Sequence, residues 1–279
     1  MASGIFTVLG CPILEDELIY GIINDDEDKD IYLIETEPSR SLALKLERNK
    51  IPYSEIKEND FLENGVKGNP SGFSIVIKML DMALHREPEN LREEIEKEVV
   101  KFSGKSDVIA LYYGMCGNYG WDMTEWAEEN NLCPVFVFRD RKGKVCDDCV
   151  AVAVGGTDKY RELLRAHTGR MYFTPGVAVN WNDFLAANGM FGCEWGNNVE
   201  RLKWIFEQCN YDAVVQIDTG LGDYEELCKS TEEFAETYDF KIIEADDYWP
   251  DLYPAQKLYD DAKNIITMCG KSTNSILDL

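Results

Sequence analysis

Short apolar runs alternate with amphipathic segments along this chain. Residues 5–9 (Ile-Phe-Thr-Val-Leu) predict a buried strand, and residues 14–23 carry apolar positions at helical spacing. A second strand is expected at residues 31–35, and Ser39 is expected to cap a helix that continues to Lys50. The first fifty residues therefore predict a βαβα unit.

The same order of strand, small-residue turn, helix and strand recurs twice more. The second copy is expected at residues 107–113, 122–130 and 134–138, and the third at residues 211–217, 224–237 and 240–244. Such alternation is typical of an α/β fold built from βαβ units with parallel sheets. We expect three related subdomains around a central site, namely residues 1–105 with a helical extension, residues 106–205, and residues 206–279 with a C-terminal tail.

Functional groups in α/β folds gather where the carboxyl ends of strands meet the following loops. Cys11 follows the first predicted strand, Cys116 lies in the turn after the strand at residues 107–113, and Asp218 follows the strand at residues 211–217. The sequence predicts that these turns converge on one site. The alternative is that the three units are ordinary α/β repeats whose turns never meet.

The turn at residues 114–118 (Gly-Met-Cys-Gly-Asn) is the most informative local motif. Glycines on both sides of Cys116 let the backbone approach a ligand closely, and the N-terminus of the following helix is expected to lower the thiol pKa. The motif indicates a metal-ligating or nucleophilic Cys116, with Gly117 and Asn118 as ligand contacts. A thiol in an ordinary tight turn is the alternative.

Two further groups are candidate metal ligands. Cys146 and Cys149 form a Cys-x-x-Cys pair, but no second pair at zinc-ribbon spacing accompanies it, and the acids between the two thiols oppose a redox role. His85 is one of only two histidines, which excludes a three-histidine site. Taken alone, His85 is more typical of a structural residue than of a ligand.

Composition limits the classes of function. The chain has 28 basic and 52 acidic residues, a formal charge of −24, and no basic stripe, so we expect neither nucleic-acid binding nor attachment to an anionic membrane. No apolar run approaches the roughly 20 residues of a membrane helix, and the N-terminus has no signal-peptide pattern. Nine cysteines in a chain of this size indicate reduced thiols, so a cytoplasmic location is expected.

Several short motifs occur together in one order along the chain. They are Gly10-Cys11, Glu17-Leu18, Leu84-His85 with Pro88, residues 113–118, Asp148-Cys149, Gly155-Gly156, Tyr160, residues 172–176 and residues 218–220. In this order they resemble the family called domain of unknown function 1638. That family occurs in methanogenic archaea and anaerobic bacteria, often encoded near corrinoid-dependent methyltransferases.

The resemblance implies a shared site made of Cys11, Cys116, Cys149 and His85. The family usually has histidine directly before the Asp-Cys motif, whereas this chain has Asp147 there and an additional Cys146. A thiolate ligand from Cys146 in place of that histidine is one consequence.

The preferred function is therefore a cysteine-ligated metal centre, with an iron–sulfur cluster favoured over zinc, acting in anaerobic methyl-group or corrinoid metabolism. Thr174, Gly176 and Asp218 are the expected substrate contacts. A zinc-thiolate methyltransferase and a non-catalytic accessory protein of a corrinoid methyltransferase are the alternatives, so the sequence leaves open whether the protein is an enzyme. A corrinoid cofactor, a small-molecule ligand, and a corrinoid protein or methyltransferase as partner are consistent with each of these.

Overall fold

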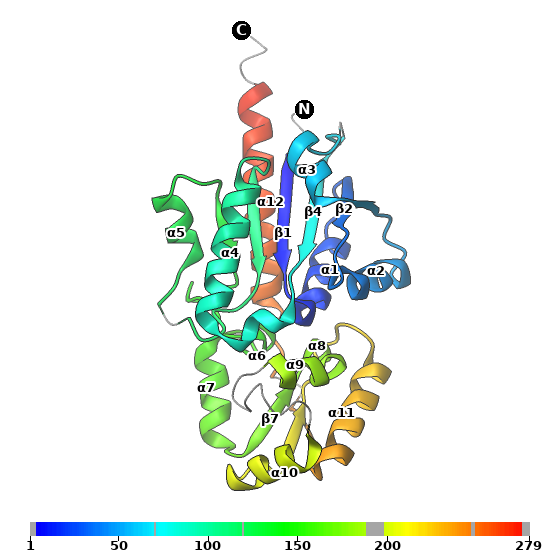
Figure 1. Cartoon of the computed structure of the whole chain (residues 1–279). Helices are drawn as coiled ribbons and strands as arrows, with labels where there is room; N and C mark the ends of the chain where they lie inside the picture. The colour runs from blue at the N-terminus through cyan, green and yellow to red at the C-terminus, as the bar shows by residue number, and fades with distance from the viewer. Residues whose placement is uncertain (1–3, 70, 119, 188–197, 247–248, 275–279) are drawn as a thin grey trace.

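The chain folds around two parallel sheets, one above the other in Figure 1. The computed structural model describes residues 4–69, 71–118, 120–187, 198–246 and 249–274. We call residues 4–148 together with the C-terminal helix the first lobe, and residues 149–246 the second lobe.

The first lobe contains a six-stranded sheet in the order β3-β2-β4-β1-β5-β6, in which every neighbouring pair is parallel. The strands are β1 (Ile5–Gly10), β2 (Lys29–Ile34), β3 (Ser54–Ile56), β4 (Phe73–Met79), β5 (Val108–Tyr112) and β6 (Val135–Val137). All residues of β4 and β5 are buried, as expected of strands covered on both faces.

Helices cover both faces of this sheet. The helices α1 (Glu15–Ile23), α2 (Ser39–Arg48) and α12 (Tyr253–Asn274) pack on one face, and α3 (Glu58–Asn64), α4 (Pro88–Ser103) and α5 (Met123–Glu129) pack on the other (Figure 1). The chain leaves β1 toward the first of these faces but leaves β4 and β5 toward the second. Strands whose following loops diverge in this way form a topological switch point, the usual position of a ligand in an α/β fold.

The second lobe contains a three-stranded parallel sheet in the order β7-β8-β9. Its strands are β7 (Arg170–Phe173), β8 (Ala213–Gln216) and β9 (Lys241–Glu244). Its helices are α6 (Cys149–Ala153), α7 (Thr157–Ala166), α8 (Pro175–Val179), α9 (Trp181–Ala187), α10 (Val199–Gln208) and α11 (Tyr224–Tyr238). Successive strands are neighbours, so this sheet is wound in one direction and has no switch point.

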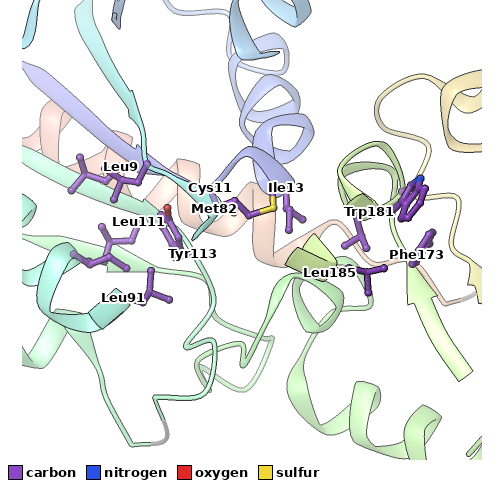
Figure 2. Close-up of a cluster of buried hydrophobic side chains, with 14 of the residues drawn as sticks. Leu9, Cys11, Ile13, Met82, Leu91, Leu111, Tyr113, Phe173, Trp181 and Leu185 are labelled. Carbon is purple, nitrogen blue, oxygen red and sulfur yellow. The ribbon is translucent and has the colours of Figure 1, made fainter. Parts of the chain in front are cut away.

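One hydrophobic cluster continues from the first lobe into the second. Figure 2 shows Cys11 and Ile13 between Leu111 of β5 and Trp181 of α9. Two short 3-10 helices carry this contact: η1 (Pro12–Leu14), which packs on α8, and η2 (Met82–Arg86), which packs on α9. The approach is so close that a Cβ atom on Gly176 of α8 would stand 1.9 Å from the carbonyl oxygen of Ile13.

The predicted α/β class with parallel sheets is confirmed. The strands of the three predicted units are distributed over two sheets: β5 and β6 join the strands of residues 1–105, whereas β7 pairs with β8. Residues 275–279 of the predicted tail lie outside the described residues. Within the described part of the chain, no helix combines the length and apolar character needed to cross a bilayer.

Candidate functional site

A cavity of about 600 Å³ lies between the lobes at the carboxyl ends of the central strands of the first sheet. Cys11 follows β1, His85 follows β4, Cys116 follows β5, and Cys149 begins α6. All four residues line this cavity. The structure therefore brings together the four side chains that the family resemblance assigned to a shared site.

Cys11 and His85 are in direct contact. The Sγ atom of Cys11 lies 3.3 Å from Nε2 of His85. The backbone N–H of Cys11 donates to the carbonyl of Tyr112 on β5, which fixes the loop after β1. The His85 ring stacks on the ring of Tyr113 with 5.6 Å between their centres, and burial lowers the pKa of His85 to about 4. His85 is therefore neutral at physiological pH and available as a nitrogen ligand.

Cys116 is held against the segment that precedes Cys149. Its backbone N–H donates to the carbonyl of Asp147 at 2.7 Å, and Cys116 has a positive φ of 46°. Gly114 permits this approach, because a Cβ atom there would stand 2.6 Å from the Cα atom of Asp148. Gly114 thus brings two distant parts of the sequence together, whereas the motif had suggested a close approach to a ligand.

Asp148 positions Cys149 at the start of α6. Its carboxylate caps the helix by accepting the N–H of Ala151 at 2.8 Å. Burial raises the pKa of Asp148 to about 6, and the neighbouring Asp147 adds to this rise. Asp147 also lines the cavity and pairs with Arg161 at 3.3 Å.

Four thiols line the cavity, and burial favours the protonated form of three of them, Cys11, Cys116 and Cys149. Burial raises the pKa of Cys11 to about 12 and raises the pKa values of Cys116 and Cys149 well above the ordinary value. Repulsion between the thiolates adds to the pKa rise of Cys116 and Cys149. The prediction that a helix N-terminus lowers the pKa of Cys116 was wrong, because α5 begins only at Met123 and burial dominates. Only an added positive charge would hold these sulfurs as thiolates.

Cys146 lies apart from the cavity. Its side chain is fully buried in the cluster that covers the α12 face of the first sheet, and its N–H donates to the carbonyl of Phe138. Burial raises the pKa of Cys146 to about 12. Of the Cys-x-x-Cys pair, only Cys149 lines the cavity. Cys146 is not positioned to act as a ligand there in place of the family's histidine.

The expected substrate contacts are divided. Gly117 lines the cavity, whereas Asn118 donates from its side-chain amide to the carbonyl of Pro88. Thr174 is buried as the N-cap of α8, Gly176 packs on the Ile13 carbonyl, and the Asp218 carboxylate accepts the N–H of Gly220 at 2.8 Å. These last three lie outside the cavity lining, and in the structure they stabilise turns and the contact between lobes.

Sequence reasoning missed the second lobe's contribution to the cavity. Aromatic and apolar side chains of α7, α9, α10, β7 and the loop before β8 line it, together with Arg170; the main ones are Tyr160, Leu164, Met171, Tyr172, Phe184, Ile205, Phe206 and Tyr211. Tyr160 and Tyr172 occur among the family motifs, which is the one sequence signal for them. The others become neighbours of the sulfur groups only through the packing of the lobes.

No three of the His, Cys, Asp and Glu side chains in the described ranges are close enough together to hold a metal ion. The donors line one cavity, but they are not arranged as a preformed site for a single ion. Any metal centre at this position must span the separation between them or draw them together.

The family model described as "Protein of unknown function (DUF1638)" matches residues 79–249. The chain belongs to the DUF1638 family. The DUF1638 match includes His85, Cys116 and Cys149 but begins after Cys11, which lies on the strand end directly beside them. Searches of curated proteins and of solved structures gave no significant match.

Proposed function

We propose that this DUF1638 protein binds a metal centre in the cavity between its lobes, through Cys11, Cys116 and Cys149, with His85 as a further donor. One observation carries the proposal: four soft or borderline donors from four separate segments of the chain line the same cavity at a switch point. Metal binding at these buried thiols would displace their protons, and the charge of the metal would offset the burial of the thiolates.

An iron–sulfur cluster is the preferred form of this centre. Thiolates bound to a cluster stand further apart than thiolates bound to one ion, which is consistent with donors that line a cavity without forming a single-ion cage. A cluster held there would supply electron transfer or an open iron site facing the cavity. The role that fits the family's genomic context is in anaerobic methyl-group metabolism, beside a corrinoid protein or methyltransferase.

Zinc is the second candidate, and the contact between Cys11 and His85 favours it. A sulfur and a nitrogen 3.3 Å apart form the beginning of a mixed Cys/His donor set, which zinc commonly takes. Zinc-bound thiolates would support transfer of a methyl group to a thiol acceptor. This candidate requires the remaining donors to close around one ion.

Metal analysis of anaerobically purified protein tests the proposal. We expect iron and acid-labile sulfide in constant ratio to protein, with visible absorption, and we expect Cys116→Ser to lose both. Cys133→Ser is the matched control, because Cys133 is a half-buried cysteine just before β6, at the amino end of the strands and outside the cavity lining. Zinc without sulfide would support the second candidate, and protein free of both metals would overturn the two together.

A further inference from the structure

The cavity has two chemically different ends. The sulfur groups and the carboxylates of Asp147 and Asp148 lie at the end formed by the loops of the first sheet. Arg170 lies at the other end, because β7 runs from Arg170 toward α8, and α8 packs on η1 beside Cys11. The four residues of β7 rise about 3.3 Å each, so the two ends are roughly 10 Å apart along this strand.

Arg170 differs from most arginines of this acidic chain. In the described ranges, six arginines form ion pairs with carboxylates: Arg40, Arg48, Arg92, Arg139, Arg141 and Arg161. These ranges provide no such partner for Arg86, Arg165 or Arg170, and both Arg86 and Arg170 line the cavity. Arg170 is also half-buried, which makes a missing counter-charge costly.

The positive charge of Arg170 acts inside the cavity wall. Burial raises the pKa of Tyr172, and the nearby charge of Arg170 opposes this rise. A guanidinium group that is half-buried, faces a cavity and has no carboxylate partner among the described residues is well suited to pair with the carboxylate of a ligand. At the opposite end Asp147 is already paired with Arg161, and the exposed Arg86 beside His85 is the other cation that lines the cavity, so the two arginines must be tested separately.

Apolar side chains lie between the two ends. Met171, Phe184, Ile205 and Tyr211 are half-buried: each packs on the core of the second lobe and also lines the cavity. Partly exposed aromatic and apolar groups around one enclosed space favour a ligand with an apolar body.

We infer that the cavity binds an elongated organic carboxylate with an apolar body, whose carboxylate pairs with Arg170 and whose other end reaches the sulfur groups. The inference rests on the proposed function only for the chemistry at the sulfur end. The ligand class follows from the second lobe, which contributes none of the proposed metal ligands except Cys149.

Calorimetric titration with 4-phenylbutyrate and its neutral amide tests the inference, because the two probes share size and apolar body. We expect the purified protein to bind the carboxylate at least about tenfold more tightly than the amide. Arg170→Gln should remove this preference, and Arg170→Lys should retain part of it. Arg165→Gln is the matched control, since Arg165 is an exposed arginine on α7 outside the cavity lining.

Three results would overturn the inference: no binding of either probe, equal affinity for both, or loss of the preference in Arg86→Gln rather than in Arg170→Gln. Circular dichroism of each variant verifies that it is folded. Metal content separates this test from that of the metal centre. Cys116→Ser should lose metal and keep the carboxylate preference, and Arg170→Gln should keep metal and lose the preference.

Discussion

Both lobes end their parallel strands in small-residue turns, but they use those turns differently. In the first lobe the turns present Cys11, His85 and Cys116 to the cavity. In the second lobe the corresponding turns hold Thr174 and Asp218, whose oxygens cap or close local backbone. The difference follows from the order in which the strands of each sheet are connected. The first sheet reverses direction at β1 and opens a crevice there, whereas the second sheet is wound one way and has none.

The comparison teaches that a strand's carboxyl end is a functional position only where neighbouring loops diverge. Where they do not, the same residue types serve to fasten the lobes together. The following substitutions test this division of roles, beginning with the largest expected effect.

Gly176→Ala should be the most damaging change in the second lobe. The added Cβ atom would meet the Ile13 carbonyl oxygen at 1.9 Å, and both partners are backbone, so η1 and α8 must separate. We expect a loss of about 3 kcal/mol of unfolding free energy, measured by chemical denaturation, together with reduced metal content because Cys11 adjoins η1. Gly104→Ala is the control, since a Cβ atom on Gly104 meets nothing within 4 Å. Equal stability of the two variants would contradict the close contact.

Glu17→Gln should change how stability depends on pH. Burial and then the charge of Asp16 raise the pKa of Glu17 to about 8, above the value of about 4.3 in an unfolded chain. Folding therefore takes up a proton between these values, so the contribution of Glu17 to stability is greatest below about pH 4.3 and is lost as the pH rises through 8.

In Glu17→Gln the decline in stability from pH 5 to 8 should be shallower, and the variant should be about 1–2 kcal/mol more stable than the wild type at pH 8. Glu15, whose pKa burial raises to about 7, acts in the same direction, so part of the slope remains. Thermal unfolding across this pH range is the measurement. Glu129→Gln, at the exposed end of α5, is the control. An unaltered pH profile would show that Glu17 is ionised in the fold.

Thr174→Ala should weaken the second lobe without affecting the cavity. Its hydroxyl oxygen accepts the N–H of Val177 at the start of α8. Losing this cap should cost about 1 kcal/mol of unfolding free energy, and Thr174→Ser should restore most of it. Metal content and carboxylate binding should match the wild type. Loss of ligand binding in both variants would indicate that Thr174 contacts the substrate, as expected from the sequence.

Arg48→Ala should have the smallest effect. Arg48 reaches from α2 to Glu226 and Asp223 of the second lobe at 2.8 and 3.3 Å, but all three side chains are largely exposed. We expect a loss of about 0.5 kcal/mol or less, which disappears in high salt. A larger loss that high salt abolishes would mean that charge, rather than the buried contact at Gly176, holds the lobes together.

The sequence predicted those features of the fold that arise from local pattern. The strands β1, β2, β5, β6, β8 and β9 correspond to apolar runs that can be recognised in the sequence. The strands β3 and β4 were not predicted. The order in which the strands join the sheet was not predicted either, because it depends on contacts between distant residues. The return of α12 to the first sheet is equally non-local, and for this reason three predicted units became two lobes.

The candidate site was likewise predicted only in part. The convergence of Cys11 and Cys116 could be predicted because parallel strands present their carboxyl ends at one edge, whereas Cys149 and His85 were expected there only from the family resemblance. The same argument failed to place Thr174 and Asp218 at the cavity, because it did not distinguish one sheet from two. Arg170 could not be recognised from the sequence, since only the packing of the lobes places this arginine at the cavity.

The chain crosses between the lobes twice, once from β6 into α6 and once from β9 back into α12. The N–H of Asp251 donates to the carbonyl of Ala153 at 2.9 Å, so the outgoing and returning segments are tied to each other. The hydrophobic cluster that continues from one lobe into the other would also have to be exposed before the lobes could separate. Ligand exchange should therefore proceed through the mouth of the cavity, by side-chain rotation, rather than by a jaw-like opening of the protein.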